Sequence, residues 1–234
     1  MAGLGSRFKD AGYTVPKYRI EARGKSLFAW SMLSLRAMWK ESRFFFIARR
    51  EDEAWEFIRD ECREMGIGEW RLIELERTTS GQAETALYAL PYWESGRPLL
   101  IYNIDTYVEP GLLSPADFHG DGFLPCFCGE GDHWSFVRLD ETGKAVEVRE
   151  KRRISPLCTV GAYYFRSCGL FRALYEADYG SGLRPESGER YVAPLYNRLI
   201  AEGGKVFVSD IPPEKVHVLG TPAELQDFLN GSHA

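Results

Sequence analysis

Met1-Ala2-Gly3-Leu4-Gly5-Ser6-Arg7-Phe8 opens the chain, and Pro16-Lys17 follows it. Two glycines with one residue between them let the backbone bend sharply and approach a ligand closely. Backbone N–H groups in such a turn can donate hydrogen bonds to anionic oxygens. The guanidinium of Arg7 adds a permanent positive charge and several donors in a planar fork. Lys17 offers a second cation to the same ligand. The stretch therefore predicts a polyphosphate-binding loop, in preference to a flexible terminus rich in small residues.

Length and composition describe an ordinary globular chain. Its 234 residues suffice for one sizeable domain, or at most two small ones. The net charge of −5 argues against a nucleic-acid partner, which would need a broad basic surface. No apolar run approaches the roughly 20 residues of a membrane span, and no signal peptide is visible. We therefore expect a cytoplasmic protein that binds phosphates in a local basic pocket, without a nucleic-acid or membrane partner.

Cysteine usage also fits the cytoplasm. The count is odd and the spacing is not that of a disulfide framework, as expected in a reducing compartment. Cys126-x-Cys128 could be half of a metal site, but no second Cys or His pair follows at zinc-like spacing. Residues two apart on a strand share one face, so we favour a plain strand there. The five cysteines are Cys62, Cys126, Cys128, Cys158 and Cys168.

The first half of the chain alternates helical and strand patterns. Apolar spacing predicts helices over about 26–40 and 51–65, the second with Trp55, Ile58 and Cys62 on one stripe. This alternation predicts a doubly wound α/β domain with a parallel sheet, in which the last strand lies centrally. The other elements predicted here are a helix that opens at Gly81 and buried strands at 44–48, 72–75 and 99–102.

Short strands dominate the second half of the chain. They are joined by turns, which indicates a mixed rather than a purely parallel sheet. Thr221-Pro222 is typical of a helix start, with an N-cap followed by proline at the first helical position. The strands are predicted at 123–129, 134–140, 145–150, 158–166 and 206–208, the helices at 167–177, 189–202 and 221–229, and a polar loop at 179–188.

Three polar groups stand at the ends of these elements. Asp105 follows the 99–102 strand, where a carboxylate can hold a divalent metal that bridges phosphates, or can simply cap a turn. Glu150-Lys151 can bind a hydroxylated or phosphorylated substrate, although without context a solvated charge run is the commoner interpretation. Gln82 can read a base edge through its amide while Gly81 leaves room for the base, and the alternative is a plain helix start.

Together these pieces resemble the sugar-phosphate nucleotidyltransferases. The match runs in order through the opening stretch with its lysine, then Asn103-Ile104-Asp105, Glu150-Lys151 and Val160-Gly161-Ala162-Tyr163-Tyr164-Phe165. The resemblance covers nearly the whole chain. Two further stretches look like the branch found in capsule and surface-polysaccharide biosynthesis, namely Gly188-Glu189-Arg190-Tyr191-Val192-Ala193-Pro194-Leu195-Tyr196-Asn197 and Leu219-Gly220-Thr221-Pro222.

The resemblance implies a fold and an activity. The fold is a Rossmann-like, doubly wound mixed sheet in a single domain over 1–234, with a nucleotide-binding half over 1–115 and an acceptor-binding half over 116–234. The implied enzyme is a nucleotidyltransferase, which joins an NTP to a sugar 1-phosphate or similar phosphorylated acceptor and releases pyrophosphate. Mg²⁺ is the implied cofactor, and homo-oligomerisation stays open.

The same resemblance assigns roles to residues. Arg7 and Lys17 are the implied catalytic residues: Arg7 holds the phosphates that leave as pyrophosphate, and Lys17 bridges the α-phosphate and the incoming phosphate. Asp105 is the implied magnesium ligand. The implied nucleotide-binding residues are Ala2, Gly3, Leu4, Gly5, Ser6, Gly81, Gln82 and Ala83, and the implied acceptor-binding residues are Glu150, Lys151 and Gly161.

The sequence departs from the family pattern at three places. The family has an apolar strand ahead of the glycine turn, whereas this sequence opens inside the turn, so we expect the fold to lack that first strand. Many relatives carry a second metal aspartate where this chain has Val218, beside His217; we expect the metal to rest on Asp105 and phosphates rather than on His217. Gly81-Gln82-Ala83 replaces the usual Gly-Thr-Ala, which leaves the base preference open.

Three alternatives remain. The acceptor could be a non-sugar phosphate, phosphocholine-like or phosphoamide, held in a cation–π cage of Trp134, Tyr163 and Tyr164 by a cytidylyltransferase; these rings serve equally well in a core. A non-catalytic nucleotide-binding relative would keep the fold without turnover. A dinucleotide-binding oxidoreductase is disfavoured, because Phe8 stands where the third glycine of Gly-x-Gly-x-x-Gly belongs.

Overall fold

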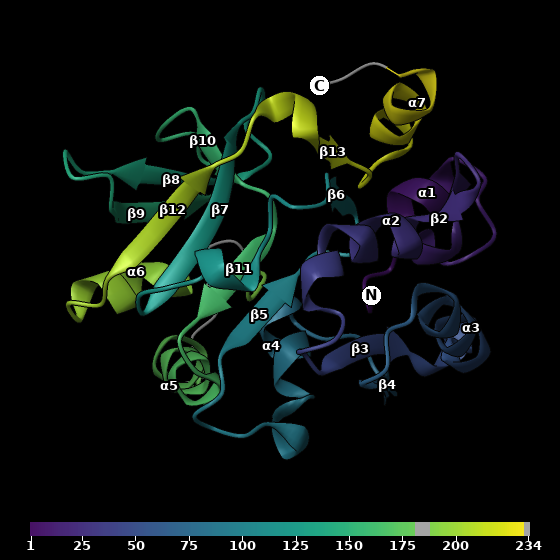
Figure 1. The fold of residues 1–234 in the computed structure, drawn as a ribbon, viewed down its shortest axis with the longest axis horizontal. Coiled ribbons are helices and arrows are strands. Elements are labelled where there is room, and N and C mark those ends of the chain that lie inside the picture. The colour runs from purple at the N-terminus through teal and green to yellow at the C-terminus, as the bar shows by residue number, and fades with distance from the viewer. Residues whose placement is uncertain (181–187, 232–234) are drawn as a thin grey trace. The chain divides into compact units, whose positions relative to one another are not determined.

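The computed structural model describes residues 1–180 and 188–231, so most of the loop expected over 179–188 lies outside the described residues. The chain forms two compact units, each assembled from separate stretches of sequence (Figure 1). The predicted division at residue 115 assigns functions to two halves, and it stays a prediction. Unit 1 consists of Met1–Thr78, Asn103–Pro115 and Pro213–Ala234, and unit 2 of Thr79–Tyr102 and Ala116–Pro212.

Unit 1 combines helices with pairs of short strands. Residues 1–5 lead into α1 (Ser6–Asp10) without a strand. The strands pair as β1 (Glu21–Ala22) with β2 (Lys25–Ser26), antiparallel; β3 (Phe44–Arg49) with β4 (Trp70–Leu75), parallel; and β6 (Thr106–Val108) with β13 (Val216–Val218), antiparallel. The longer helices are α2 (Leu27–Ser34), α3 (Trp55–Met65) and α7 (Pro222–Asn230), and 3-10 turns lie at η1 (Lys17–Arg19), η2 (Arg36–Met38), η3 (Arg50–Asp52) and η6 (Pro213–Lys215).

One apolar cluster joins the beginning and the end of the sequence within unit 1. Phe8 of α1 lies in the same buried cluster as Leu27 of α2 and as Leu225 and Phe228 of α7. Phe8 is only 2% exposed. Since burial of a phenylalanine side chain contributes roughly 1.5–3 kcal/mol, this contact anchors the glycine turn that immediately precedes Phe8.

Unit 2 is built on a mixed sheet. Its main path runs β5-β11-β7-β10-β8-β9, and β12 pairs with β7 from outside that path. The β12–β7 pair is parallel, and Figure 1 shows the two strands side by side, whereas the other pairs of this sheet are antiparallel. The strands are β5 (Leu99–Tyr102), β7 (Gly122–Cys128), β8 (Ser135–Leu139), β9 (Ala145–Glu150), β10 (Leu157–Thr159), β11 (Ala162–Phe165) and β12 (Val206–Asp210).

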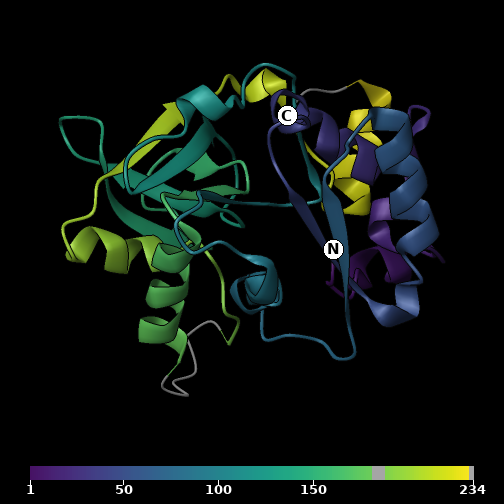
Figure 2. The same ribbon diagram turned by 60° about the horizontal axis from the view of Figure 1, so that its bottom comes forward.

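Helices complete unit 2. α5 (Cys168–Tyr179) and α6 (Leu195–Ala201) pack against each other, as the green and yellow-green helices in Figure 2 show. α4 (Gln82–Leu87) and the turn η4 (Leu90–Tyr92) precede β5, and η5 (Pro115–Asp117) lies where the chain passes into unit 2. Among residues 1–180 and 188–231, none of the helices combines the length and apolarity that a membrane crossing requires.

Most predicted elements are present, and the mixed α/β fold is confirmed. Several details were wrong. The helix expected over about 26–40 ends at Ser34, before the separate turn η2. Of the strands predicted in the first half, only β3 and β4 form a parallel pair, since β5 pairs antiparallel with β11. The helix expected from 189 begins at Leu195. The strand expected over 158–166 is two strands, interrupted at Gly161, where φ is +78°. The 99–102 strand ends the main path instead of lying centrally. Trp55 is 54% exposed, although Ile58 and Cys62 on its helix are fully buried.

Candidate active site

The glycine turn leads directly into a short helix in unit 1. Gly5 has φ of +62°, the left-handed region that favours glycine, and it caps α1. Its carbonyl accepts hydrogen bonds from the N–H groups of Phe8 and Lys9, both at 3.1 Å. Arg7 follows on α1 with an exposed side chain. The remaining residues predicted to bind nucleotide here are Ala2, which is buried, and Gly3, Leu4 and Ser6, which are exposed.

Lys17 lies next to this turn. A Cβ placed on Gly5 would be 3.9 Å from the Cβ of Lys17, so the Lys17 side chain begins beside the glycine turn. Pro16 precedes η1 with φ of −53°, which the proline ring fixes. The predicted association of the glycine turn with the lysine ten to twelve residues later is therefore present in unit 1.

Asp105 meets Lys17 in an ion pair. The Nζ of Lys17 donates to the Oδ2 of Asp105 at 2.6 Å, and the two side chains are 22% and 26% exposed. Burial raises the pKa of Asp105, but the charge and hydrogen bond of Lys17 outweigh it and hold that pKa below its usual value. The carboxylate is therefore ionised at neutral pH and carries a cation.

Asp105 is positioned by a strand pair that sequence patterns did not reveal. β5 ends at Tyr102, and Asp105 stands instead directly before β6. Its carbonyl accepts from the N–H of Leu219 at 2.8 Å, which extends the β6–β13 pairing by one step. A Cβ on Gly220 would lie 3.1 Å from the Oδ2 of Asp105, so glycine keeps that side of the carboxylate open.

These residues fit a magnesium ion held largely by substrate. In the part of the chain that the structure describes, no three His, Cys, Asp or Glu side chains gather in a metal-binding group. Mg²⁺ does not need such a cage, since it usually takes one or two carboxylates together with phosphate oxygens and water. The Asp105 carboxylate already holds a cation, the ammonium of Lys17, at Oδ2. The donor chemistry of Asp105 is therefore suitable.

His217 belongs to the packing of β13 rather than to the Lys17–Asp105 pair. Its ring stacks on Tyr107 with centroids 5.2 Å apart and contacts Phe228 at 5.5 Å. Its Nε2 lies 3.6 Å from a carboxylate oxygen of Glu109, which also pairs with Lys215 at 2.7 Å. These contacts favour Asp105 over His217 as the candidate ligand.

The predicted base-binding turn lies in unit 2 and packs against a distant segment. Gly81 has φ of +142°, and a Cβ there would be 2.7 Å from the backbone N and O of Arg190. The N–H of Arg190 donates to the carbonyl of Ser80 at 2.7 Å, and the N–H of Ala83 donates to the carbonyl of Arg190 at 2.9 Å. Gln82 is the first residue of α4. Glycine is required at position 81 because the Arg190 backbone occupies the space of a side chain.

Glu150 is the last residue of β9 in unit 2, and Lys151 follows it in a turn. The carboxylate of Glu150 accepts from the hydroxyl of Ser135, whose oxygen lies 3.2 Å from the hydroxyl of Tyr163. Burial raises the pKa of Glu150, against the lowering effects of the Ser135 hydrogen bond and of Lys151. Lys151 has φ of +53°, and its Nζ donates to the hydroxyl of Tyr191 at 2.6 Å. The pair therefore presents a hydrogen-bond acceptor, the carboxylate of Glu150, and a donor, the Nζ of Lys151, beside hydroxyl groups.

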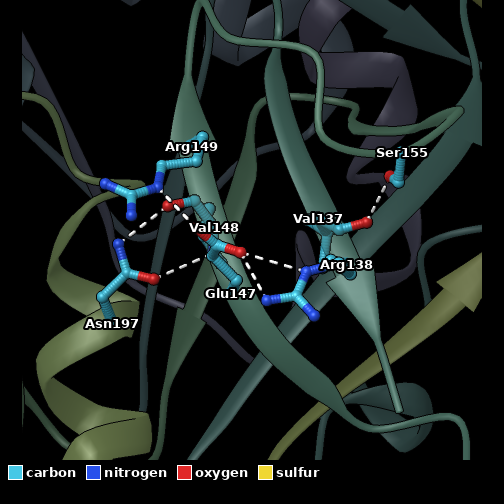
Figure 3. A network of polar contacts seen from close by, with 7 residues as sticks. All are labelled: Val137, Arg138, Glu147, Val148, Arg149, Ser155 and Asn197. Atoms are coloured by element: carbon cyan, nitrogen blue, oxygen red, sulfur yellow. Dashed lines mark hydrogen bonds and ion pairs between the residues drawn. The ribbon is translucent and has the colours of Figure 1, made fainter. Parts of the chain in front are cut away.

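A side-chain amide holds the strand that carries this pair. Figure 3 shows Asn197 of α6 facing β9: its Oδ1 accepts from the N–H of Val148 at 2.8 Å, and its Nδ2 donates to the carbonyl of Val148 at 2.7 Å. On the same strand, Glu147 pairs with Arg138 at 2.6 Å and with Arg149 at 2.7 Å. The charge run around Glu150 is thus partly a structural network.

The remaining sequence candidates have separate surroundings. Gly161 turns the chain between β10 and β11, and the N–H of Val160 before it donates to the carbonyl of Pro125 at 3.0 Å. The three rings considered for a cation–π cage have different neighbours: Trp134 packs on Phe127 and His133, Tyr164 stacks on Phe118, and the Tyr163 hydroxyl bonds with Ser135 and Thr159. Cys126 is buried whereas Cys128 is exposed, which fits a strand end.

Within each unit, the structure thus assembles part of the predicted site. Unit 1 unites Gly5, Lys17 and Asp105, and unit 2 unites Glu150-Lys151 with Tyr191. Sequence reasoning did not assign a role to Tyr191 or to its neighbour Arg190, although both lie in the stretch 188–197 that carried the family resemblance. The spacing from Lys151 gave no signal, since the contact joins residues 40 apart.

Known proteins provide an independent comparison. No protein-family model matches the chain, and no curated protein does. A solved structure of a nucleoside-diphosphate-sugar pyrophosphorylase from Vibrio cholerae RC9 is 36% identical, with 98% of both chains covered and a TM-score of 0.90. Two more distant structures are similar in fold. The inositol-1-phosphate CTP transferase from T. maritima is 18% identical over 99% of this chain and 91% of that chain, with a TM-score of 0.75. The CTP:phosphocholine cytidylyltransferase from Streptococcus pneumoniae is 13% identical over 98% of this chain and 95% of that chain, with a TM-score of 0.75.

Proposed function

Because the chain belongs to the sugar-phosphate nucleotidyltransferases, enzymes that transfer a nucleotidyl group to a phosphate acceptor, we propose that its acceptor is a sugar 1-phosphate. The second substrate is an NTP, and the products are an NDP-sugar and pyrophosphate. The observation that carries this proposal is the Lys17–Asp105 pair next to the glycine turn, at 2.6 Å. It brings a phosphate-binding cation and a metal-binding carboxylate to one place.

The reaction needs no covalent intermediate with the protein. A phosphate oxygen of the acceptor attacks the α-phosphorus of the NTP in line, the bond from that phosphorus to the bridging oxygen breaks, and pyrophosphate leaves. Catalysis then consists of positioning and of neutralising negative charge, which preorganised cations do well in a partly dry site. Such a reaction requires fixed cations both at the attacking phosphate and at the leaving pyrophosphate.

Unit 1 supplies these groups in our proposal. The turn of residues 2–6 cradles the triphosphate, and Arg7 holds the two phosphates that depart. Lys17 contacts the α-phosphate and the incoming phosphate. Asp105 holds Mg²⁺, which when bound neutralises phosphate charge and orients the phosphate oxygens. The exposure of Arg7 and the partial exposure of Lys17 and Asp105 support roles toward a ligand.

Unit 2 supplies substrate recognition. Gly81, Gln82 and Ala83 contact the base, with the Gln82 amide as donor and acceptor. Glu150 accepts from hydroxyl groups of the acceptor, Lys151 meets its phosphate, and Gly161 leaves room for it. The hydrogen bonds of Glu150 to Ser135 and of Lys151 to Tyr191 support this proposal, since both side chains already bind hydroxyl groups within the protein.

We also propose a setting for the enzyme. The stretches 188–197 and 219–222 support a role in capsule or surface-polysaccharide biosynthesis, in the cytoplasm. All five cysteines are free thiols, which suits a reducing compartment.

Pyrophosphate release tests the proposal. The chain is incubated with Mg²⁺, with each of ATP, CTP, GTP, UTP and dTTP, and with a panel of sugar 1-phosphates, inositol 1-phosphate and phosphocholine. Release that depends on one NTP and one sugar 1-phosphate is the expected result, and the same panel identifies both. Release only with phosphocholine or inositol 1-phosphate would replace the sugar acceptor, and no release with any pair would remove the enzymatic assignment.

A further inference from the structure

The segment Glu189–Tyr191 of unit 2 contacts both predicted substrate-binding groups of that unit. Through its backbone, Arg190 bonds the turn around Gly81, with bonds of 2.7 and 2.9 Å to Ser80 and Ala83. The next residue, Tyr191, accepts a hydrogen bond at its hydroxyl oxygen from the Nζ of Lys151 at 2.6 Å. Two groups that the sequence separates by 70 residues thus meet on three consecutive residues.

Tyr191 fixes the Lys151 ammonium by more than one contact. The Nζ of Lys151 donates a hydrogen bond to the phenol oxygen at 2.6 Å and also makes a cation–π contact with the ring, 4.8 Å from its centroid. The Tyr191 hydroxyl in turn donates to the carboxylate of Glu189. An ammonium, a phenol and a carboxylate therefore form a chain of oriented donors and acceptors, which restricts a side chain that otherwise has four rotatable bonds.

The segment itself is held rigidly from the other side. The carbonyl of Tyr191 accepts from the hydroxyl of Tyr179 on α5 at 2.9 Å, and the guanidinium of Arg190 donates to the hydroxyl of Tyr175 at 2.6 Å. The next residue, Val192, is fully buried. These contacts fix the backbone on which the Tyr191 ring stands, so the phenol oxygen is preorganised before any ligand binds.

We propose that Tyr191 is a positioning residue that holds the Lys151 ammonium where it binds the phosphate of the acceptor. This inference rests on the proposed function, because Lys151 meets the acceptor only under that proposal. Its consequence is selective. Loss of the Tyr191 hydroxyl weakens binding of the acceptor and leaves binding of the NTP unchanged, because the backbone bonds between Arg190 and the Gly81 turn do not involve that hydroxyl.

The test compares Tyr191→Phe with Tyr164→Phe. Both remove one hydroxyl from a ring of unit 2, and Tyr164 stacks on Phe118 at 5.4 Å without contacting Lys151. With the NTP and acceptor that the wild-type chain uses, Tyr191→Phe raises KM for the acceptor about tenfold, as loss of one hydrogen bond to a charged group predicts. KM for the NTP and the melting temperature stay at wild-type values, and Tyr164→Phe changes none of these quantities.

A second readout needs no turnover. Acetylation with a limiting amount of reagent, followed by peptide mass spectrometry, measures how fast Lys151 reacts. In Tyr191→Phe the amino group of Lys151 has lost its hydrogen bond, so this rate increases several-fold. In Tyr164→Phe the rate stays at the wild-type value. An unchanged acceptor KM in an active Tyr191→Phe enzyme would overturn the positioning role. Suppose that Lys151 is labelled faster in Tyr191→Phe but the wild-type chain releases no pyrophosphate with any substrate pair. The contact between Lys151 and Tyr191 would then be supported, and the proposed function would be refuted.

Discussion

The ammonium of Lys17 and the carboxylate of Asp105 lie 2.6 Å apart although 88 residues separate them in the sequence. Each group is the present partner of the other, whereas the proposed reaction gives Lys17 a phosphate and Asp105 a metal ion. In the proposed reaction, substrate binding must therefore separate the ion pair. The ammonium of Lys17 then binds phosphate, and the carboxylate of Asp105 becomes available to the metal ion. Until then, the ion pair keeps both side chains next to the glycine turn with their charges neutralised.

Removal of either proposed catalytic cation is expected to lower turnover without lowering the stability of the fold. Lys17→Met and Arg7→Ala each reduce kcat/KM by about 100-fold or more, since an electrostatic contact to the reacting phosphates is lost. Both side chains are at least partly exposed, so the melting temperature changes little. Pyrophosphate release and calorimetric melting measure the two quantities.

Lys40→Met is the matched control, because Lys40 is an exposed lysine in a turn of the same unit. It removes the same charge and leaves turnover unchanged. Near-normal turnover in both Lys17→Met and Arg7→Ala would contradict the assigned site.

The Lys17–Asp105 pair also predicts how a divalent ion binds without substrate. Because the ammonium occupies the Oδ2 of Asp105, Mn²⁺ as a spectroscopic probe binds the free protein weakly. Lys17→Met removes this competitor and increases the Mn²⁺ affinity, while Asp105→Asn abolishes the binding. Electron paramagnetic resonance of free Mn²⁺ at fixed pH measures all three proteins. Equal affinities in the wild-type chain and in Lys17→Met would show that the pair does not compete with the metal.

Gly81 and Gln82 are adjacent, yet their substitution has different consequences. Gln82→Ala removes the amide proposed to contact the base, so it raises KM for the NTP alone. Gly81→Ala forces a Cβ to within 2.7 Å of the Arg190 backbone, so the segment that carries Tyr191 must shift. Gly81→Ala therefore raises KM for both the NTP and the acceptor, and lowers the melting temperature. Steady-state kinetics with each substrate varied in turn distinguish the two patterns; an acceptor KM unaffected by Gly81→Ala would argue against the coupling.

The partly buried carboxyl of Glu150 makes stability depend on pH in a predictable direction. Burial raises its pKa above the ordinary 4.5, so in that range the folded chain binds more protons than the unfolded chain. Stability from this group is present below the ordinary pKa and is lost as pH rises through the raised one. Relative to the wild type, Glu150→Gln is therefore more stable at about pH 7 than at about pH 4.

Urea unfolding at both pH values measures this difference. Glu141→Gln, in the exposed turn between β8 and β9, serves as the control and tracks the wild type at both. A Glu150→Gln variant whose stability relative to the wild type is the same at both pH values would contradict the burial argument.

Local patterns predicted the elements that depend on local interactions. α7 begins where Thr221-Pro222 indicated, because the Thr221 hydroxyl accepts the N–H of Glu224 at 3.2 Å. β3 and β4 were visible as apolar runs. By contrast, the helix expected from 189 starts six residues later, since the backbone at Arg190 pairs with the distant turn at Ser80 instead of with its own helix. Sequence periodicity contains no information on that partner.

The candidate site divides in the same way. The proximity of the glycine turn and Lys17 could be predicted, because their residue types and their short separation in the sequence both indicated it. The support of Asp105 could not, since β6 and β13 have only three residues each and begin 110 positions apart, at 106 and 216. The contact of Lys151 with Tyr191 likewise joins two chain segments that only the folded sheet brings together.

The Asn197 amide has a further consequence for the sheet of unit 2. β9 stands at the end of the strand path, where an exposed row of peptide groups would offer a template to a strand of another molecule. Asn197 imitates a neighbouring peptide by binding both the N–H and the carbonyl of Val148. One side chain thus occupies the hydrogen-bonding groups that an intermolecular strand would need at the middle of β9, the strand that ends at Glu150 of the proposed acceptor-binding pair.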